Sequence, residues 1–547
     1  MMTTQEALAR RSSAPMVIAL VWAFSWFALL GVRPLFNPDE GRYAEIPREM
    51  LATGDWLVPH LDNLVYIEKP PLQYWATAVS FEVFGIDVWA ARFYTGLCTL
   101  LTVLVIAALA RRLWGSSAAW RAGIMLASML GMIVIGQQLT LDMSLTFFLT
   151  LTLAAFCVAQ EAAMPQARRR YWMWLAWGSA AAAFLTKGLV ALVLPALTLV
   201  AYSLLYRHWK PWRRLSLLSG FALFALITVP WCVLMQRHVP QFFDFFFIRE
   251  HFQRFLTRIE DRYEPAWFFI PVLAAGCVPW ILPAARALGS AWKSSNAQAD
   301  FEPRAFLWVW AVVVFVFFSM SDSKLIPYIL PLFPALALLM AATSAESLRR
   351  DLVRTCAGVI AVGVLLIAVA GMLPQLLHDP ARAPYFGELR LPLLAMGLIA
   401  VGGGWIARGR REPATALGIT AYLCFIILLV SARSIAPLYS GASLAAQISH
   451  AIMPSTRIYA VRTYDQTLPF YLGRTMTLVE TRGELDFGLR LEPEKAVGTL
   501  AAFTGRWTAE PEALAVMEPD TYALLRTQGL PMVVRANSPG RLIVSRR

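Results

Sequence analysis

The chain alternates long apolar runs with short polar segments, many of them basic. The hydrocarbon core of a bilayer needs about 20 apolar residues for each helix that crosses it. The runs of that kind lie near residues 15–36, 88–110, 117–137, 142–163, 171–186, 188–206, 215–235, 266–286, 305–320, 325–344, 355–374, 389–407 and 413–433. The pattern therefore predicts a polytopic α-helical membrane protein with about 13 transmembrane helices.

Composition supports this class of protein and excludes others. Hydrophobic residues make up 58% of the 547 residues, charged residues make up 15%, and the mean hydropathy is +0.56. Soluble domains are about 45–50% apolar and about 25% charged. A soluble enzyme, a disordered regulator and a nucleic-acid-binding module are therefore excluded. The six cysteines have neither metal nor redox spacing, so we expect them to be small core residues.

Basic clusters between the apolar runs predict the orientation of the chain. The formal net charge is +13, but residues 434–547 carry 12 Lys and Arg against 10 Asp and Glu, so the excess lies among the runs. The clusters are Arg111-Arg112, Arg168-Arg169-Arg170, Arg207 to Arg214, Arg349-Arg350 and Arg408 to Arg411. They fall on one side of the predicted spans, which the positive-inside rule makes cytoplasmic, together with the N-terminus. An odd number of spans then places the C-terminus outside.

The first apolar run does not have the pattern of a signal peptide that is removed. The first apolar run follows Arg10-Arg11 and leads directly into Val32-Arg33-Pro34, and no small-residue cleavage site closes it. We therefore expect an uncleaved first span.

Three outer segments are too long to be simple connections, and long loops are usually functional. They are residues 37–87, 236–265 and 434–547. In the first, helical spacing of apolar residues from Tyr43 to Leu51, ended by Gly54, and the Pro70-Pro71 pair predict two short helices that lie on the membrane.

The last segment predicts a separate domain. Its strand-like runs alternate with short helical patterns. These runs are Ile458 to Thr463, Thr475 to Val479, Met532 to Val534 and Leu542 to Val544. We expect a transmembrane domain, 1–433, followed by a small α/β domain, 434–547.

Signals for nucleotide binding are weak. The chain has no G-x-x-x-x-G-K motif. Residues Gly402 to Ala407 fit a G-x-G-x-x-A pattern, but they lie inside an apolar run with no strand before them. Close packing of helices through small residues explains that segment better, so we expect no nucleotide cofactor.

A pair of carboxylates stands where the first span meets the outer face, in Asn37-Pro38-Asp39-Glu40. One interpretation is a helix start, with Asn37 as the N-cap and Glu40 closing a capping box. The other is a catalytic pair that orients an acceptor or stabilises positive charge at a sugar carbon. The spacing alone leaves both open.

Two outer segments offer groups for a phosphate. Lys69 comes just before a predicted helix N-terminus, which together with the lysine makes a natural anion site; the commoner role of a lone lysine is to reach the lipid head groups. In the second segment an aromatic run serves as an interfacial anchor. The arginines interleaved with it or following it can hold a lipid phosphate: Arg249, Arg254, Arg258 and Arg262.

The same segments offer a weak zinc site. His251 and Glu68 can both bind zinc, but two ligands are few for such a site, and a lone histidine is more often structural. Glu68 and His251 are therefore the pair that the sequence offers for a divalent metal such as zinc.

The placement of polar residues favours an enzyme over a transporter. Asp142 stands at an outer end of a span, and Ser321 to Tyr328 form a polar turn between two spans. A transporter is expected to place ionisable groups near the midplane, and most of the predicted spans have none there. The pattern therefore favours chemistry at the outer membrane surface over a polyprenyl-lipid flippase or transporter.

Five segments in this order resemble a known family, the lipid-linked-sugar transferases of the C-type glycosyltransferase (GT-C) fold. Among them the chain is most similar to the bacterial aminoarabinose transferases of lipid A. The segments are Asn37 to Ala44, Glu68 to Leu72, Thr140 to Asp142, Leu185 to Gly188 and Ser323 to Pro331. The resemblance runs from about residue 15 to 434, whereas the last domain matches only in length and placement.

The resemblance implies roles for individual residues. Asp39 becomes the principal catalytic carboxylate, with Glu40 and Asp142 as supporting acids. Five residues become candidates for binding the donor phosphate: Tyr66, Lys69, Arg42, Arg254 and Tyr328. Because a lipid A phosphate is already anionic near neutral pH, the acceptor scarcely needs a general base. We expect Asp39 to orient groups or to stabilise an oxocarbenium-like transition state.

The resemblance also implies the reaction. It implies a monomeric enzyme of the bacterial inner membrane with its active site and last domain in the periplasm. An inverting transfer would move 4-amino-4-deoxy-L-arabinose from undecaprenyl phosphate to lipid A. The added amine reduces negative charge, which implies resistance to polymyxin and other cationic peptides. The alternative enzyme is a relative that glycosylates protein or another lipid from the same class of donor.

Overall fold

The computed structural model describes residues 14–253, 263–293, 300–379, 382–481, 483–510 and 512–546. Up to residue 439 the chain is mostly helical. The helices there are α2 (Ala14–Ala28), α3 (Asp39–Thr53), α4 (Leu72–Phe84), α5 (Val88–Trp114), α6 (Ser116–Ala127), α7 (Leu130–Gly136), α8 (Leu141–Ala159), α9 (Gln166–Lys187), α10 (Val190–Tyr206), α11 (Lys210–Arg213), α12 (Leu217–His238), the π-helix η1 (Asp244–Gln253), α14 (Phe269–Gly276), α15 (Ile281–Ala291), α16 (Pro303–Met320), the 3₁₀-helix η2 (Ile326–Leu332), α17 (Phe333–Ala341), α18 (Ala345–Leu376), α19 (Ala383–Gly387), α20 (Arg390–Arg408), α21 (Pro413–Ser431) and α22 (Ala436–Tyr439).

Each of the predicted apolar runs contains a helix or a broken pair of helices. Within the described residues, seven helices are long and apolar enough to cross a membrane, or up to nine if each of two bent pairs is one span. The pairs are α6 with α7, bent by 60°, and α14 with α15, bent by 116°. Pro279 lies in the second break, where its missing N–H cannot continue a helix. The chain is therefore a multi-pass membrane protein, whereas thirteen as the number of spans stays a prediction.

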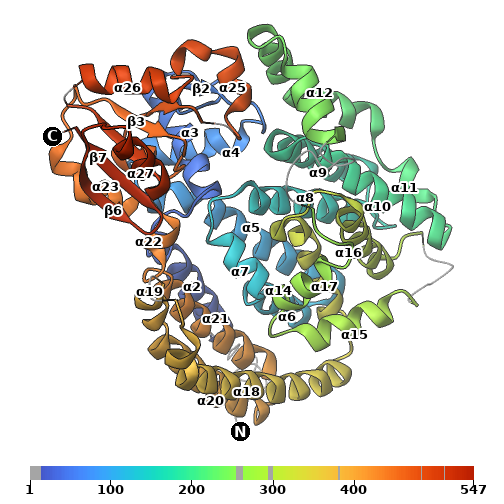
Figure 1. The fold of residues 1–547 in the computed structure, drawn as a ribbon. Coiled ribbons are helices and arrows are strands. Elements are labelled where there is room, and N and C mark those ends of the chain that lie inside the picture. Colours follow the sequence, from blue (N-terminus) through green and yellow to red (C-terminus); the bar gives the residue numbers. More distant parts are fainter. Residues whose placement is uncertain are drawn as a thin grey trace.

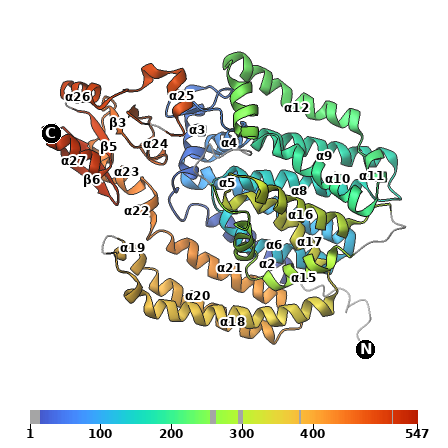
Figure 2. The ribbon, with the colours of Figure 1, turned by 45° about the vertical axis from the view of Figure 1, so that its right-hand side comes forward.

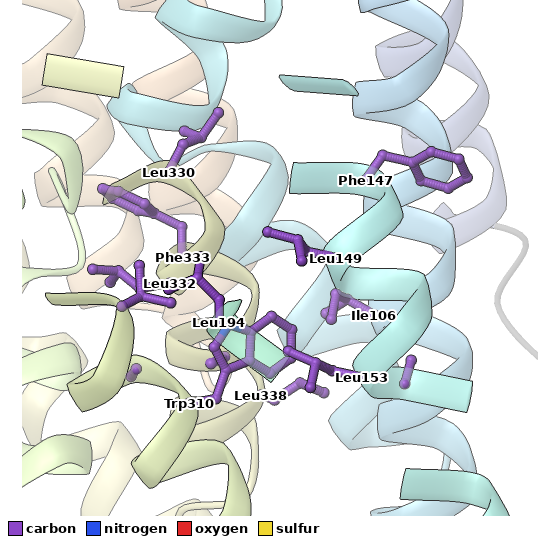
Figure 3. Packing of buried hydrophobic residues seen from close by; sticks show 14 of the residues in the cluster. Ile106, Phe147, Leu149, Leu153, Leu194, Trp310, Leu330, Leu332, Phe333 and Leu338 are labelled. Atoms are coloured by element: carbon purple, nitrogen blue, oxygen red, sulfur yellow. The ribbon is translucent and has the colours of Figure 1, made fainter. Parts of the chain in front are cut away.

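The centre of the bundle is a layer of interlocking apolar side chains (Figure 3). Ile106 of α5, Leu149 and Leu153 of α8, Leu194 of α10 and Trp310 of α16 gather there, and each is at most 3% exposed. Lipid tails are as apolar as these side chains, so close packing, rather than transfer out of water, holds such a core together. The packed core gives the loops at its ends a rigid base.

Helices α18, α20 and α21 form an arm beside the rest of the bundle (Figures 1 and 2). Gly403 of α20 lies against Thr420 of α21, and Gly404 lies against the backbone of Cys356 in α18; a Cβ at either glycine would collide with its neighbour. The interpretation of Gly402 to Ala407 as a helix-packing segment is therefore confirmed.

Many large apolar side chains face outward from the bundle. Leu218 of α12 is 89% exposed, and Leu391 and Trp405 of α20 are 74% and 70% exposed. Such a surface is unfavourable in water and favourable against lipid tails, which agrees with a membrane protein.

The first outer segment folds as two helices joined by a hairpin. Helix α3 ends at Gly54, whose φ of 74° is the left-handed conformation that glycine adopts without strain. The strands β1 (His60–Leu61) and β2 (Leu64–Val65) pair antiparallel around Asp62 and Asn63, which both have positive φ, as a tight two-residue turn requires. The two predicted helices are confirmed; their lying on the membrane stays a prediction.

The last part of the chain is an α/β domain. Its elements are α23 (Ala442–Ile448), η3 (Ser449–Ala451), β3 (Ile458–Val461), α24 (Leu468–Leu472), β4 (Thr477–Val479), α25 (Asp486–Leu491), η4 (Pro493–Lys495), α26 (Leu500–Ala509), β5 (Leu514–Met517), α27 (Pro519–Thr527), β6 (Val533–Ser538) and β7 (Arg541–Ser545). The sheet has the order β4-β3-β5-β7-β6. Strand β3 runs parallel to β4 and β5, and β7 runs antiparallel to β5 and β6.

This domain packs on the first outer segment (Figure 1), with α24 against α3 and α25 against β2. Strands β3, β4, β6 and β7 match the predicted runs, and the central strand β5 was not predicted. The domain therefore covers the helix that begins with the candidate carboxylates.

Candidate active site

Asp39 and Arg42 lie one turn apart on α3 and form an ion pair. Arg42 Nη2 lies 2.6 Å from Asp39 Oδ1, while Arg42 Nη1 donates to the Tyr66 hydroxyl at 2.8 Å and lies 2.9 Å from Glu484 Oε2. The Arg42 side chain is 5% exposed and the Asp39 side chain 46%. The Asp39 carboxylate is therefore held by a buried guanidinium and remains open to a substrate.

Lys69 joins the first outer segment to the second. Its Nζ lies 2.7 Å from Glu250 Oε2 of η1 and 3.0 Å from the backbone oxygen of Glu68. The Glu68 carboxylate lies 3.9 Å from both Lys69 Nζ and Arg42 Nη1. The structure thus brings Asp39, Arg42, Tyr66, Glu68 and Lys69 together, while the catalytic and phosphate-binding roles predicted for them stay predictions.

Glu40 points away from this cluster into a buried network. Its carboxylate pairs with Arg33 at 2.5 Å and with Arg92 of α5 at 2.8 Å, and accepts from the backbone N–H groups of Phe36 and Leu139 at 2.9 and 3.0 Å. Burial disfavours its ionised form, but the charges and hydrogen bonds of the two arginines outweigh burial and hold the pKa of Glu40 at about 2. Its environment is that of a structural anion.

The capping-box interpretation of this segment is wrong. No side chain caps the first turn of α3. The amide of Asn37 instead bonds the last domain: its Nδ2 donates to Asp465 Oδ1 at 3.0 Å and its Oδ1 accepts from the N–H of Thr467 at 3.1 Å. Asn37 therefore ties the start of α3 to the domain that covers it.

Asp142 and Tyr328 meet through a third residue. The Lys187 ammonium at the end of α9 bonds the Asp142 carboxylate in the first turn of α8, and it lies 4.4 Å from the centre of the Tyr328 ring. Asp142 and Tyr328 thus contact the same cation. These three residues are far apart in the sequence, so no local sequence pattern could have predicted that they meet.

Tyr43 connects the two clusters electrostatically. Burial raises the pKa of its phenol well above the ordinary value, and the charges of both Asp39 and Asp142 add to that rise against the opposing charge of Arg42. Both carboxylates therefore lie near enough to this one buried hydroxyl to affect its ionisation, which makes the two clusters neighbouring parts of the candidate site.

Part of the predicted site lies outside the described residues. Arg254 lies outside them. The side chain of His251 also lies outside them, although its backbone belongs to η1. Within the ranges that the structure describes, no group of three or more His, Cys, Asp and Glu side chains could hold a metal ion. The Glu68 carboxylate instead lies 3.9 Å from each of two cationic side chains, Arg42 and Lys69. The zinc prediction for Glu68 and His251 is therefore without support.

Sequence reasoning missed several residues of the site. The role of Lys187 could have been suspected from its place in the family-like segment Leu185 to Gly188, after an apolar stretch of α9, and that of Arg92 from a charge inside an apolar helix. Glu250 and Glu484 had no such signal, because carboxylates are common in long segments outside the apolar runs.

The arrangement suits transfer from a glycosyl phosphate. An ammonium group is a strong point charge for a phosphate, and Lys69 and Lys187 both lie in the site. A preorganised carboxylate stabilises positive charge that develops at a sugar carbon, and Asp39 has the exposure for that contact.

Comparisons with known proteins agree with this chemistry. The sequence model of a family described as "Dolichyl-phosphate-mannose-protein mannosyltransferase" matches residues 13–246. A second, described as "Aminoarabinose transferase C-terminal domain", matches residues 444–546. Together the two matches cover the helical bundle up to η1 and the α/β domain.

Solved structures define the fold. The crystal structure of ArnT from Cupriavidus metallidurans bound to undecaprenyl phosphate has a TM-score of 0.90 at 34% identity and covers 98% of both chains. The Archaeoglobus fulgidus oligosaccharyltransferase has a TM-score of 0.53 at 11% identity, covers 93% of this chain and 69% of its own, and shares the fold alone. The chain has the GT-C fold, with a C-terminal α/β domain.

Sequence relatives define the family. The undecaprenyl phosphate-alpha-4-amino-4-deoxy-L-arabinose arabinosyl transferase 1 of Sodalis glossinidius is 35% identical over 439 residues, which are 77% of this chain and 75% of the relative. The chain belongs to the family of undecaprenyl phosphate-alpha-4-amino-4-deoxy-L-arabinose arabinosyl transferases, and it is a glycosyltransferase.

Proposed function

We propose that this enzyme transfers 4-amino-4-deoxy-L-arabinose from undecaprenyl phosphate to the phosphate groups of lipid A. The site lies at the periplasmic face of the inner membrane, and the enzyme acts as a monomer. The observation that carries the proposal is the likeness over 98% of the chain to the ArnT whose structure holds undecaprenyl phosphate, together with the half-exposed Asp39 carboxylate in the same charged cluster as the Lys69 ammonium.

The reaction exchanges one bond at the sugar carbon C1. A lipid A phosphate oxygen forms a bond to C1 from one side, while the bond from C1 to the donor phosphate oxygen breaks on the other. The electron pair leaves with undecaprenyl phosphate, and the configuration at C1 inverts. No oxidation takes place, and the donor lipid, rather than a nucleotide, supplies the sugar.

The described residues divide the work by charge. Asp39 stabilises the positive charge that develops at C1, while Arg42 fixes its direction. Lys69, with Tyr66 at the same cluster and Arg254 outside the described part, holds the donor phosphate and stabilises it as it leaves. Asp142 acts as a supporting acid and Tyr328 as a further candidate for the donor phosphate, and Lys187, which bonds Asp142 and lies over the Tyr328 ring, holds both in place.

The product explains a cellular effect. Each transferred sugar adds an ammonium group to an anionic lipid, so cationic peptides such as polymyxin bind the modified surface less strongly. The enzyme is therefore proposed to confer resistance to them.

Transfer in detergent tests the proposal. The purified chain is mixed with the labelled donor lipid and lipid A, and label on lipid A is measured by mass spectrometry. A transfer in detergent, where no bilayer has to be crossed, supports the enzyme over a flippase.

A protein acceptor is the second candidate, favoured by the mannosyltransferase match over residues 13–246. Label on a membrane protein instead of on lipid A would replace the first proposal by the second.

A further inference from the structure

Glu484 belongs to the C-terminal domain, but its carboxylate lies in the catalytic cluster. Its Oε2 is 2.9 Å from Arg42 Nη1, and its Oε1 accepts from Gln466 Nε2 at 2.6 Å. Its side chain is 21% exposed, so solvent screens this pair only in part. A residue from the far end of the sequence thus binds the guanidinium that holds Asp39.

The guanidinium transmits the position of Glu484 to Asp39. Its nitrogens lie in one rigid plane, so a bond at Nη1 fixes the direction of Nη2. Nη1 is bonded to Tyr66 and Glu484, and Nη2 is bonded to Asp39 Oδ1 at 2.6 Å. Removal of the Glu484 charge would leave the Tyr66 hydroxyl, a weaker neutral acceptor, to hold Nη1, so the guanidinium would fix the direction of Asp39 less firmly.

The surrounding backbone keeps Glu484 in register with α3. A Cβ at Gly41 would collide with the backbone of Gln466, so the first turn of α3 lies directly on the C-terminal domain. Asn37 bonds Asp465 and Thr467 just before that turn. The two parts of the chain therefore meet on both sides of Asp39, and Glu484 is held where Arg42 needs it.

We propose that Glu484 is a positioning residue for the transfer, contributed by the C-terminal domain. It holds Arg42 so that the Asp39 carboxylate faces the reacting sugar carbon. The proposal rests on the proposed function, since Asp39 is assigned to the reaction there, and it deepens that function by giving the C-terminal domain a part in the active site.

A double-mutant cycle tests this role. Glu484→Gln keeps the size of the side chain and removes its charge. Loss of a charge-assisted hydrogen bond corresponds to about ten- to hundredfold. We expect kcat to fall by about that factor while the KM for the donor lipid changes by less than about twofold. In an Asp39→Asn background the same substitution should have no further effect on kcat, because the group that Glu484 positions is already lost.

Controls separate positioning from a general loss of structure. Glu494→Gln changes an exposed carboxylate of the same domain and should leave kcat and the unfolding temperature unchanged. Gln466→Ala removes the other partner of Glu484 and should lower kcat by a smaller factor, again only when Asp39 is present. If the Glu484 variant fails to fold, Gln466→Ala can take its place in the double-mutant cycle with Asp39→Asn.

The outcomes are distinct. Additive losses for Glu484 and Asp39, or a rise in donor KM with unchanged kcat, would overturn the positioning role while leaving the transfer itself in place. A wild-type enzyme that puts no label on lipid A under the same conditions would contradict the proposed function instead.

Discussion

At the scale of single residues, two neighbouring carboxylates of α3 have opposite environments. The Asp39 side chain is 46% exposed and touches one arginine, whereas Glu40 is 3% exposed and bonds two arginines and two backbone N–H groups. Different environments give like groups different tasks. We therefore expect Asp39 to act on the substrate and Glu40 to hold the site together.

Asp39→Asn is expected to lower kcat by about a hundredfold or more, because a preorganised charge at the transition state contributes on that scale. The amide keeps the size and most hydrogen bonds of the carboxylate, so the KM for the donor should change little. Initial rates with varied donor lipid measure both. Transfer near the wild-type rate would show that this carboxylate has no part in the chemistry.

Lys69→Ala is expected to raise the apparent KM for the donor lipid by about ten- to hundredfold, with turnover partly restored at high donor concentration. A charge-assisted bond to a phosphate contributes about that much to binding. Lys293, an exposed lysine two residues after α15, provides a matched control as Lys293→Ala. Equal donor KM values for the two variants would contradict the assignment.

Glu40→Gln is expected to lower the free energy of unfolding by about 3–5 kcal/mol, because it leaves two buried arginines without their anion. Since the pKa of Glu40 is lowered from 4.5 to about 2 in the folded state, its contribution is full above about pH 4.5 and is lost as the pH falls toward 2. Denaturant unfolding in detergent measures the loss, with exposed Glu82→Gln as the control. Matching stabilities would refute this structural role.

Sequence could find the residues of the site that stand close together in the chain. Tyr66, Lys69, Asp39 and Arg42 come from one outer segment, so their approach needs only a helix and a hairpin. Lys187 and Glu484 reach the same site from other elements, and no local pattern encodes such long-range contacts. The burial of Glu40 could not be predicted either, because it depends on Arg92 from α5, two helices further along the chain.

At the scale of elements, α3 and the β1–β2 hairpin enclose a surplus of acidic groups. Glu49 accepts from the N–H groups of Asp62 and Asn63, and Asp62 accepts from the N–H of Met476 in the C-terminal domain at 2.6 Å. Burial, aided by nearby carboxylates, raises the pKa of Glu49 and of Asp62 to about 8. The contact between hairpin and domain is therefore sensitive to pH.

Stability is expected to fall as the pH rises from about 5 to about 8. The folded state keeps protons on Glu49 and Asp62 that the unfolded state releases near pH 4, so unfolding becomes more favourable throughout that window. Unfolding temperatures across it should fall less steeply for Asp62→Asn than for the wild type. Asp520→Asn, an exposed change in the same domain, should keep the wild-type slope. Identical slopes for all three would contradict these pKa values.

Helices were easier to predict than their breaks or the sheet. The apolar runs give helices directly, since a helix satisfies its own backbone in lipid. The strand β5, Leu514–Met517, has buried side chains on both faces and residues that also favour helices, so neither periodicity nor propensity distinguishes it. Its neighbours β3 and β7 decide its conformation.

At the scale of the whole molecule, the basic clusters fix the expected topology. A reporter that works only in the periplasm should be active when fused after Arg547 and inactive when fused after Arg170, because positive loops stay in the cytoplasm. Colony assays with both fusions, and with the complementary cytoplasmic reporter, check this. The opposite pattern would place the catalytic cluster on the cytoplasmic side.

The close approach of Gly41 to Gln466 has a consequence for how such enzymes can diverge. A gene segment for the C-terminal domain cannot be exchanged alone between distant relatives, because the incoming backbone must fit a helix start that leaves no room for a side chain. Functional hybrids should arise when residues 37–87 travel with 434–547, and recombination within this pair should be penalised. The two ends of the gene are therefore expected to be inherited as one unit.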